Sequence, residues 1–370
     1  MNAPRLEINL DAISHNTQVL VDRMASLGVT VCGVTKATLG HPDVGRAMLA
    51  GGVSSLGDSR IENVERLRRA GVLAPILLTR SPMVSQVDRV VAGADASLNS
   101  ELEVIELLSA AAVRQNRVHL VVLMVELGDR REGVMPSALL ELAGAVLALP
   151  GVALHGIGTN LACQNGVIPD AINMTELSEL ANYVESEFAI TLDIVSGGNS
   201  SNLGWVFDPA SEIGRINHLR LGESILLGVD PVSRAAIDGL RRDAFTLVGE
   251  VIESQSKPSR PRGTIGPTSF ADRVEPSGSD RAATQVLVAI GEQDVDPRGL
   301  TALDGATIAG ASSDHLVLRD MTVSTPVGTD VKFRVDYAAL LRAMTSPFVA
   351  QHVVTSETPG SSMSPARPTG

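Results

Sequence analysis

The chain has 370 residues and carries 30 basic against 42 acidic residues, a formal net charge of −12. This length exceeds the usual about 100–200 residues of one domain, and the acidic balance disfavours nucleic-acid and anionic-membrane partners, which attract clustered positive charge. Two cysteines are too few for a disulfide framework, and with neither a long apolar run nor a signal-peptide pattern we expect a cytoplasmic protein that acts on small molecules.

Short β-rich runs alternate with helical stretches from residue 29 to about 228, which predicts parallel strands joined by crossover helices. Helices are expected between them, as at Pro42–Ala50, Ile61–Ala70 and Ser137–Leu149. This α/β pattern favours a compact (β/α)8 TIM-type barrel, with a doubly wound sheet as the alternative. The eight predicted strands are Val29–Lys36, Ser54–Ser59, Pro75–Thr79, Ala96–Ser100, His119–Leu127, Ala153–Leu161, Thr191–Gly197 and His218–Leu226.

After Gly228 the pattern changes, and Asp230–Asp243 predicts a linker and a helix. Alternating β signals then predict a smaller, mainly β C-terminal domain, interrupted by a loop over Ser254–Arg281. The tail Glu357–Gly370 is expected to be disordered. The predicted β-domain strands are Phe245–Glu253, Thr284–Gly291, Thr307–Ala311, His315–Leu318 and Val331–Arg334. The predicted units are an N-terminal strand in 1–10 that joins the β domain, the barrel in 11–235, the β domain in 236–354 and the disordered tail in 355–370.

Reactive groups of such barrels gather at the C-terminal ends of the strands, and the first predicted strand ends on Lys36. Lys36 is one of only three lysines in a chain whose other basic residues are arginines. Desolvation lowers the pKa of a lysine and frees its amine to attack an aldehyde. An exposed cation at a strand end is the alternative interpretation.

Three other strand ends carry groups that suit an anionic ligand. The seventh run leads into Ser196–Ser201, whose glycines and hydroxyls fit either a phosphate site or a tight turn. The eighth run places Arg220 inward, where a guanidinium needs a partner such as a ring nitrogen or a carboxylate. The fifth run closes on Glu126–Gly133, whose paired arginines fit either an anion site or surface salt bridges.

These motifs, in this order, resemble those of the fold-type III pyridoxal phosphate (PLP) enzymes, the alanine racemase group, and are most similar to its ornithine racemase branch. Val34-Thr-Lys-Ala37 resembles the family's lysine motif, which implies that Lys36 carries PLP as a Schiff base. The resemblance also implies Arg131 beside the cofactor's phenolic oxygen and Arg220 against its pyridine nitrogen. Further implied PLP contacts are Asn160, Asn199, Ser200, Ser201, Gly222 and Ser224.

Racemisation needs two acid/base groups on opposite faces of Cα. In alanine racemases one is a tyrosine from the partner subunit, but the corresponding stretch Ile290–Asp296 has none, and the family's tyrosine after the lysine is missing too. The two tyrosines of the chain, Tyr183 and Tyr337, are expected to lie elsewhere. Candidates for the second group are Glu292, Asp294, Asp314 and His315 in the β domain, and Cys163 or His41 at the barrel mouth.

Two of these candidates have competing interpretations. Cys163 fits a catalytic thiol at the end of the sixth strand and equally a small buried side chain. Asp314, in a segment that resembles the family loop reaching into the neighbouring active site, is favoured over His315.

The missing tyrosines open space, and the acidic candidates add negative charge, which favours a long substrate with a distal cation. The predicted function is therefore PLP-dependent racemisation of ornithine, or of lysine or arginine, in a homodimer with shared active sites. An arginine at the ring nitrogen weakens the electron sink of PLP, which suits prompt reprotonation. Alternatives are an alanine or broad-spectrum racemase, a PLP aldolase or decarboxylase, and a non-catalytic PLP carrier. We see no metal-ligand spacing and expect no metal.

Overall fold

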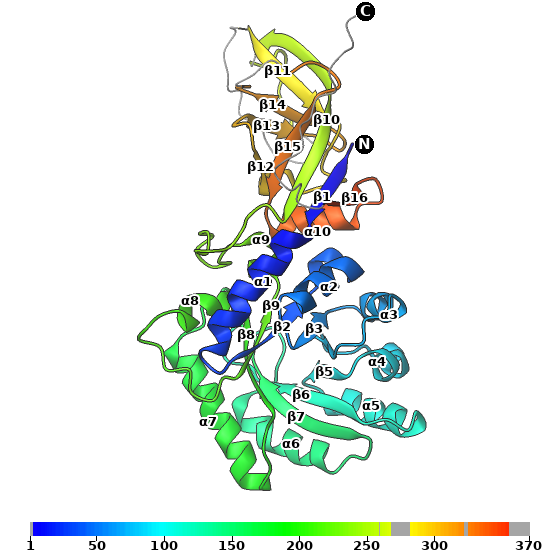
Figure 1. The fold of residues 1–370 in the computed structure, drawn as a ribbon, viewed down its shortest axis with the longest axis vertical. Coiled ribbons are helices and arrows are strands. Elements are labelled where there is room, and N and C mark those ends of the chain that lie inside the picture. The colour runs from blue at the N-terminus through cyan, green and yellow to red at the C-terminus, as the bar shows by residue number, and fades with distance from the viewer. Residues whose placement is uncertain (1–2, 259, 268–281, 322–324, 355–370) are drawn as a thin grey trace, which may run out of the picture.

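The structure is a computed structural model that describes residues 3–258, 260–267, 282–321 and 325–354. It has two parts, a barrel and an elongated β part, with helix α10 (Tyr337–Thr345) at their junction (Figure 1). The tail predicted to be disordered and residues 268–281 of the predicted loop lie outside the described residues. Within the described residues, no helix is long and apolar enough to cross a membrane.

Eight parallel strands, β2 to β9, close into a barrel in chain order, which confirms the predicted TIM-type fold. A cluster that includes Cys32, Leu98 and Met124 fills its interior, while a second, larger core packs the helices onto the strands. The strands are β2 Thr30–Val34, β3 Ser55–Asp58, β4 Ile76–Leu78, β5 Ala96–Asn99, β6 His119–Met124, β7 Val152–Gly158, β8 Ile194–Asn199 and β9 His218–Leu221. The longer helices are α1 Leu10–Ala25, α2 Pro42–Ala50, α3 Ile61–Arg69, α4 Val87–Gly93, α5 Leu102–Arg114, α6 Leu139–Leu147 and α7 Ala171–Phe188.

The first and last barrel strands are shorter than predicted. β2 ends at Val34, and Lys36 opens a 3-10 turn, η1 (Lys36–Thr38). β9 ends at Leu221, and the apolar residues after Gly222 form helix α9 (Glu223–Leu227) with buried side chains instead of continuing the strand. A short apolar run does not distinguish a buried strand from a buried helical turn by its periodicity. Both helical turns, η1 and α9, therefore begin at the C-terminal ends of barrel strands, at the barrel mouth.

The β part is one mainly antiparallel sheet in the order β12-β15-β10-β11-β14-β13. β1 (Arg5–Asn9) pairs with β10 and with β16, so the first strand of the chain lies in this sheet. The remaining bounds are β10 Phe245–Pro258, β11 Ala282–Val288, β12 Leu300–Ala302, β13 Thr307–Ala311, β14 Leu316–Arg319, β15 Asp330–Val335 and β16 Ala350–Val354.

Two predictions for this part were wrong. The helix expected within Asp230–Asp243 is absent, and the segment runs in turns. Residues 254–258 of the predicted loop belong to β10, because they pair with the first residues of β11. Local Ser and Pro content indicated a loop there, whereas cross-strand pairing decides the conformation.

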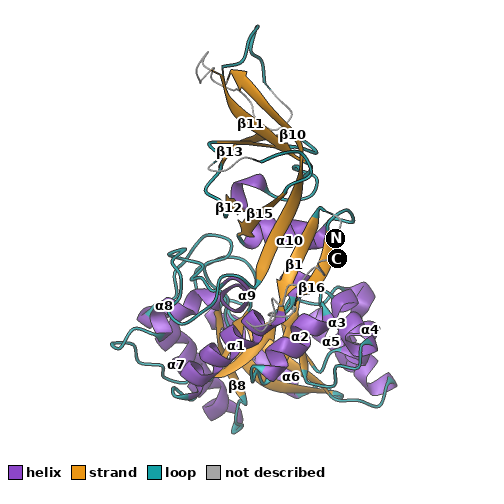
Figure 2. Ribbon diagram, turned by 45° about the horizontal axis from the view of Figure 1, so that its top comes forward, coloured by secondary structure: helices purple, strands orange, loops and turns teal. Residues whose placement is uncertain are grey.

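Helix α10 brings the β part onto the barrel mouth. It packs against η1, the turn that carries Lys36. The tilted view shows α10 between the β part and the barrel (Figure 2). The side chain of Asp336 begins the helix by accepting a hydrogen bond from the N–H of Ala339 (2.9 Å). The first residue of the helix, Tyr337, is therefore held above Lys36.

Buried Asn16 on α1 ties the barrel to the segment that leads into the β part. Its amide donates to the carbonyls of Ile225 (2.9 Å) and Arg241 (2.8 Å) and accepts from the N–H of Arg241 (2.6 Å). Loss of this amide would remove all three bonds, and unpaired buried peptide groups are costly.

We expect Asn16→Ala to lower the free energy of unfolding by about 2–4 kcal/mol, because it leaves buried backbone groups without partners. Urea unfolding followed by circular dichroism measures this change. The matched control is Gln18→Ala on the exposed face of the same helix, which should stay within about 0.5 kcal/mol of the wild type. Equal losses in both variants would contradict a bridging role for Asn16.

Candidate active site

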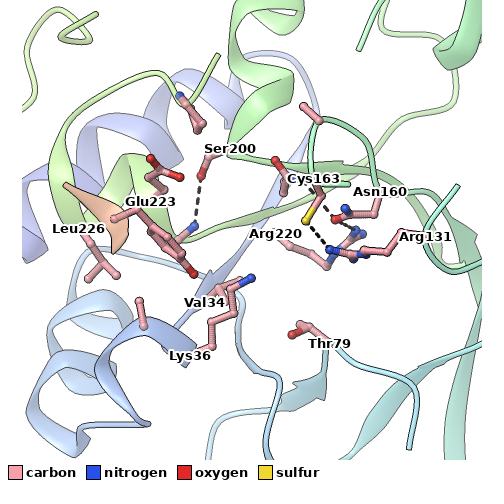
Figure 3. A pocket seen from close by; sticks show the side chains of 16 residues that line it. Val34, Lys36, Thr79, Arg131, Asn160, Cys163, Ser200, Arg220, Glu223 and Leu226 are labelled. Carbon is pink, nitrogen blue, oxygen red and sulfur yellow. Dashed lines mark hydrogen bonds between the residues drawn. The ribbon is translucent and has the colours of Figure 1, made fainter. Parts of the chain in front are cut away.

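A cavity of about 310 Å³ opens at the barrel mouth, where the ends of several strands converge (Figure 3). It gathers most of the side chains predicted to form a site, together with Thr79, Glu223 and Tyr337, which were not predicted. The predicted residues that line it are Lys36, Arg131, Asn160, Cys163, Asn199, Ser200, Arg220 and Gly222.

Lys36 projects into this cavity from η1. Its side chain keeps surface open to the cavity, yet protein surrounds it closely enough that desolvation lowers the pKa of its amine. The guanidinium groups of Arg131 and Arg220 lower that pKa further, whereas Cys163 and Asp58 oppose the shift. The amine is therefore more easily deprotonated than that of a lysine in water, which is the property a nucleophilic lysine needs.

Asp58 fixes the end of β2, the strand that precedes Lys36. This buried carboxylate accepts hydrogen bonds from the hydroxyl of Thr35 (2.8 Å), the amide of Asn63 (2.9 Å) and the N–H of Arg60 (3.0 Å). The ends of β2 and β3 are thereby joined directly beside Lys36.

Arg220 lies buried inside the barrel, as its position in the eighth predicted strand indicated. Its guanidinium donates to the carbonyl of Thr159 (2.8 Å) and to the hydroxyl of Ser196. Burial lowers the pKa of Arg220 to about 10, so it remains charged at neutral pH. Burial also lowers the pKa of His218 to about 3, so its ring is neutral, and its Nδ1 lies 2.9 Å from the hydroxyl oxygen of Ser196.

Hydrogen-bonding groups gather in a corner at the ends of β8 and β9, which we call the anion-binding corner after the ligand that its sequence predicts. The hydroxyl of Ser200 accepts from the N–H groups of Gly222 and Ser224 (both 3.2 Å) and lies 3.0 Å from the hydroxyl of Ser224. The hydroxyl of Ser201 is buried without a hydrogen-bond partner in the described structure. A Cβ atom on Gly222 would lie 3.2 Å from Cβ of Val34, so this close approach favours glycine. Several donors at one corner suit an oxyanion.

The side-chain amides of Asn199 and Asn160, at the same corner, differ in their hydrogen-bond partners. Asn199 is engaged within the protein, because its amide donates to the carbonyl of Leu161 (2.9 Å) and accepts from the N–H of Ser201 (2.8 Å). Asn160 accepts from Asn199 (3.2 Å) while its own Nδ2 is buried without a partner. Asn160 therefore has a free donor for a ligand, and Asn199 shapes the loop.

Arg131 and Cys163 meet on another wall of the cavity. Nη1 of Arg131 donates to Sγ of Cys163 (2.6 Å), and Nε and Nη2 bond to the carboxylate of Glu132. Burial alone would lower the pKa of Arg131, but Glu132 and Cys163 raise it overall. Cys163 is exposed to the cavity, so its interpretation as a small buried side chain was wrong.

Tyr337 was expected to lie away from the site, and this was wrong. Its ring lines the cavity with its centroid 5.9 Å from Nζ of Lys36. Burial raises the pKa of its hydroxyl well above the usual value, so the phenol stays protonated. No sequence pattern indicated this, because Tyr337 begins a helix distant in sequence from the barrel motifs.

The acidic candidates of the β part do not line this cavity in their own chain. Asp294 is buried and accepts from the hydroxyl of Ser346 (3.1 Å), whereas Glu292 pairs with Arg342 (3.2 Å). Asp314 is exposed and bonds to His315 (2.9 Å). Among the described residues that line the Lys36 cavity, Glu223 is the one carboxylate, and it pairs with Arg234 (3.1 Å).

Three other predicted residues also lie off the cavity wall. His41 precedes helix α2 at the barrel mouth, and its ring lies outside the set that lines the cavity. Ser201 and Ser224 stand behind Ser200 in the anion-binding corner.

Comparison with known proteins agrees with this arrangement. Residues 8–231 match the family described as alanine racemase, N-terminal domain. A lysine racemase of Thermotoga maritima is 37% identical over 350 residues, which cover 94% of this chain and 97% of that protein. An ornithine racemase of Acetoanaerobium sticklandii is 35% identical over 357 residues, which cover 95% and 99%.

The fold is also that of a solved alanine racemase from a D-cycloserine-producing Streptomyces lavendulae. The two structures superpose with a TM-score of 0.78 at 20% identity, over 96% of this chain and 98% of the other. The matched family covers most of the barrel, and the relatives match along nearly their whole length. The chain therefore belongs to the alanine racemase family.

Proposed function

We propose that this protein is a PLP-dependent racemase that interconverts the L and D forms of a basic amino acid, with ornithine as the favoured substrate and lysine or arginine as others. The observation that carries the proposal is one cavity that combines a desolvated lysine, an anion-binding corner and a buried arginine. Full-length similarity to proteins named lysine racemase and ornithine racemase supports the substrate class.

The cavity suits PLP by the chemistry of its free donors. The buried hydroxyl of Ser201 and the buried amide of Asn160 both lack partners, and a phosphate near the first and a ring substituent near the second would supply them. Ser200, Gly222 and Ser224 would hold the phosphate, and Lys36 the aldehyde carbon. When bound, PLP supplies a conjugated ring that stabilises negative charge developing at Cα.

The protein's own groups then orient the substrate and move protons. Arg220 presents a fixed positive charge that its bonds to Thr159 and Ser196 hold in place, so it orients the ring without giving up a proton. Lys36 accepts or delivers a proton at one face of Cα. Tyr337, which stays protonated, lines the cavity with its ring beside Lys36 and would pack against the bound ligand.

The substrate class and the assembly are linked in this proposal. Lys36, Arg131 and Arg220 make the cavity wall basic, so the negative charge for a distal ammonium has to come from elsewhere. In a head-to-tail homodimer, exposed Asp314 and the neighbouring Glu292 would face the cavity of the partner copy and supply it. The barrel would then perform the proton transfers, and the partner's β part would select the side chain.

We expect kcat/KM for ornithine and lysine to exceed that for alanine by at least about tenfold, because only the longer substrates reach a distal carboxylate. Polarimetry with single enantiomers of each amino acid on the PLP-loaded protein measures this. A preference for alanine would contradict the proposed substrate class and leave the cofactor assignment standing.

Lys36→Ala should remove the visible absorbance of the PLP-loaded protein and lower racemisation by at least about 100-fold, because both cofactor attachment and one proton transfer depend on this amine. Lys332→Ala is the matched control, since that exposed lysine pairs with Glu7 in the β part, away from the cavity. Retention of the absorbance band in Lys36→Ala would refute the assignment of Lys36.

The lowered pKa of Lys36 predicts its reactivity in the protein without cofactor. Because only the neutral amine reacts with trinitrobenzenesulfonate, the labelling of Lys36 should rise at a lower pH in the folded than in the unfolded protein. Peptide mass spectrometry separates Lys36 from the other two lysines. Identical pH profiles in both states would contradict the desolvation of its amine.

A further inference from the structure

The loop that follows β7 is organised around the buried carboxylate of Asp129. Its oxygens accept hydrogen bonds from the N–H groups of Cys163 (3.1 Å), Gln164 (2.7 Å), Asn165 (3.1 Å) and Val167 (3.2 Å). Burial alone would raise the pKa of Asp129, but these four donors lower it overall, so the group stays charged. One side chain therefore fixes the backbone of the whole loop.

This loop points Cys163 into the Lys36 cavity. Ala162, the residue before it, has a positive φ of 52°, an unfavourable conformation for a residue with a side chain. The hydrogen bonds to Asp129 offset this cost. The sulfur is then held by Nη1 of Arg131, whose other edge is fixed by Glu132. Such a strained and heavily bonded loop indicates that the position of the thiol matters.

Cys163 and Lys36 approach the cavity from different strand ends, β7 and β2 (Figure 3). Both side chains line the same cavity, and negative charge on the sulfur would favour the charged form of the Lys36 amine. Tyr337 does not offer the same geometry, because its ring packs beside Lys36 itself. Cys163 thus offers an ionisable group that enters the cavity from a different strand end than Lys36 and from a different element than Tyr337.

The competing carboxylates are engaged elsewhere in the chain. Asp294 is buried against Ser346, and Glu292 is bound to Arg342. Glu223 lines the cavity, but it is paired with Arg234 and follows Gly222 in the anion-binding corner, away from the wall that carries Cys163.

We propose that Cys163 is the second catalytic proton carrier, acting on the face of Cα opposite Lys36; this inference rests on the proposed racemase function. In one direction its thiolate takes the Cα proton, the electron pair of the broken C–H bond stays with the substrate, and the Lys36 amine, in its protonated form, gives a proton to the other face. The reverse direction exchanges the two roles, and nothing is oxidised or reduced. Asp129 and Arg131 are positioning residues for the thiol.

The test uses PLP-loaded wild-type and Cys163→Ala proteins with each enantiomer of ornithine in deuterium oxide. The wild type should exchange and invert both enantiomers. Cys163→Ala should invert at least about 100-fold more slowly, while one enantiomer still exchanges its Cα proton with retention, because Lys36 continues to serve its face. Asp129→Asn, which keeps the thiol but weakens the hydrogen bonds that position its loop, should slow inversion less.

Alkylation gives a second measurement that needs no variant to fold. Iodoacetamide should modify exposed Cys163 and spare buried Cys32, and inversion should disappear in proportion to the single adduct. For the Cys163→Ala variant itself, a visible absorbance and a melting temperature equal to those of the wild type would show that the cofactor and the fold are retained.

Several outcomes would overturn the assignment of Cys163. The first is inversion by Cys163→Ala at a rate within a few-fold of the wild type. The second is loss of Cα exchange from both enantiomers in that variant. The third is loss of inversion in Asp314→Asn alone, a result that would place the second carrier in the β part. A wild type that exchanges neither enantiomer would instead refute the racemase function, and this inference with it.

Discussion

The guanidinium of Arg220, buried inside the barrel, is the constraint around which the mouth of the barrel is organised. A charge in this place is tolerated only when its donors are satisfied, and its bonds to Thr159 and Ser196 draw together the ends of β7 and β8 beside its own strand. Those same strand ends lead into the Cys163 loop and the Ser200 corner. Satisfying one buried charge therefore brings two functional segments into a single cavity.

The barrel could be predicted from sequence because its strands are buried on both faces and appear as short apolar runs separated by helical stretches. Lys36 was found because it ends the first run, Arg220 because it faces inward within the eighth, and Ser200 because it follows the seventh. The residues at which these strands begin and end could not be predicted in the same way. Where a strand passes directly into a buried helical turn, as at Gly222, composition does not change and the boundary is invisible.

The residues that sequence reasoning missed depend on contacts between distant segments. Tyr337 reaches Lys36 because α10 docks on η1, a packing that no local pattern encodes. Asp129 acts on a loop some 35 residues further along, through backbone N–H groups whose positions exist only in the folded chain. The acidic residues around Asp314 were placed near the pocket by resemblance, but within one chain they lie outside it.

A second proton carrier on the barrel would have a physical advantage over one supplied by a partner subunit. A base that comes from a partner's β part makes proton transfer depend on how exactly two subunits meet. In the mechanism we propose, the thiol of Cys163, held by Asp129 and Arg131, is positioned by the same barrel that positions Lys36, so one scaffold would set the distance between the two groups. The β part is then free to vary around the substrate's side chain. Selectivity for long basic substrates could evolve there without disturbing the proton transfers at Cα.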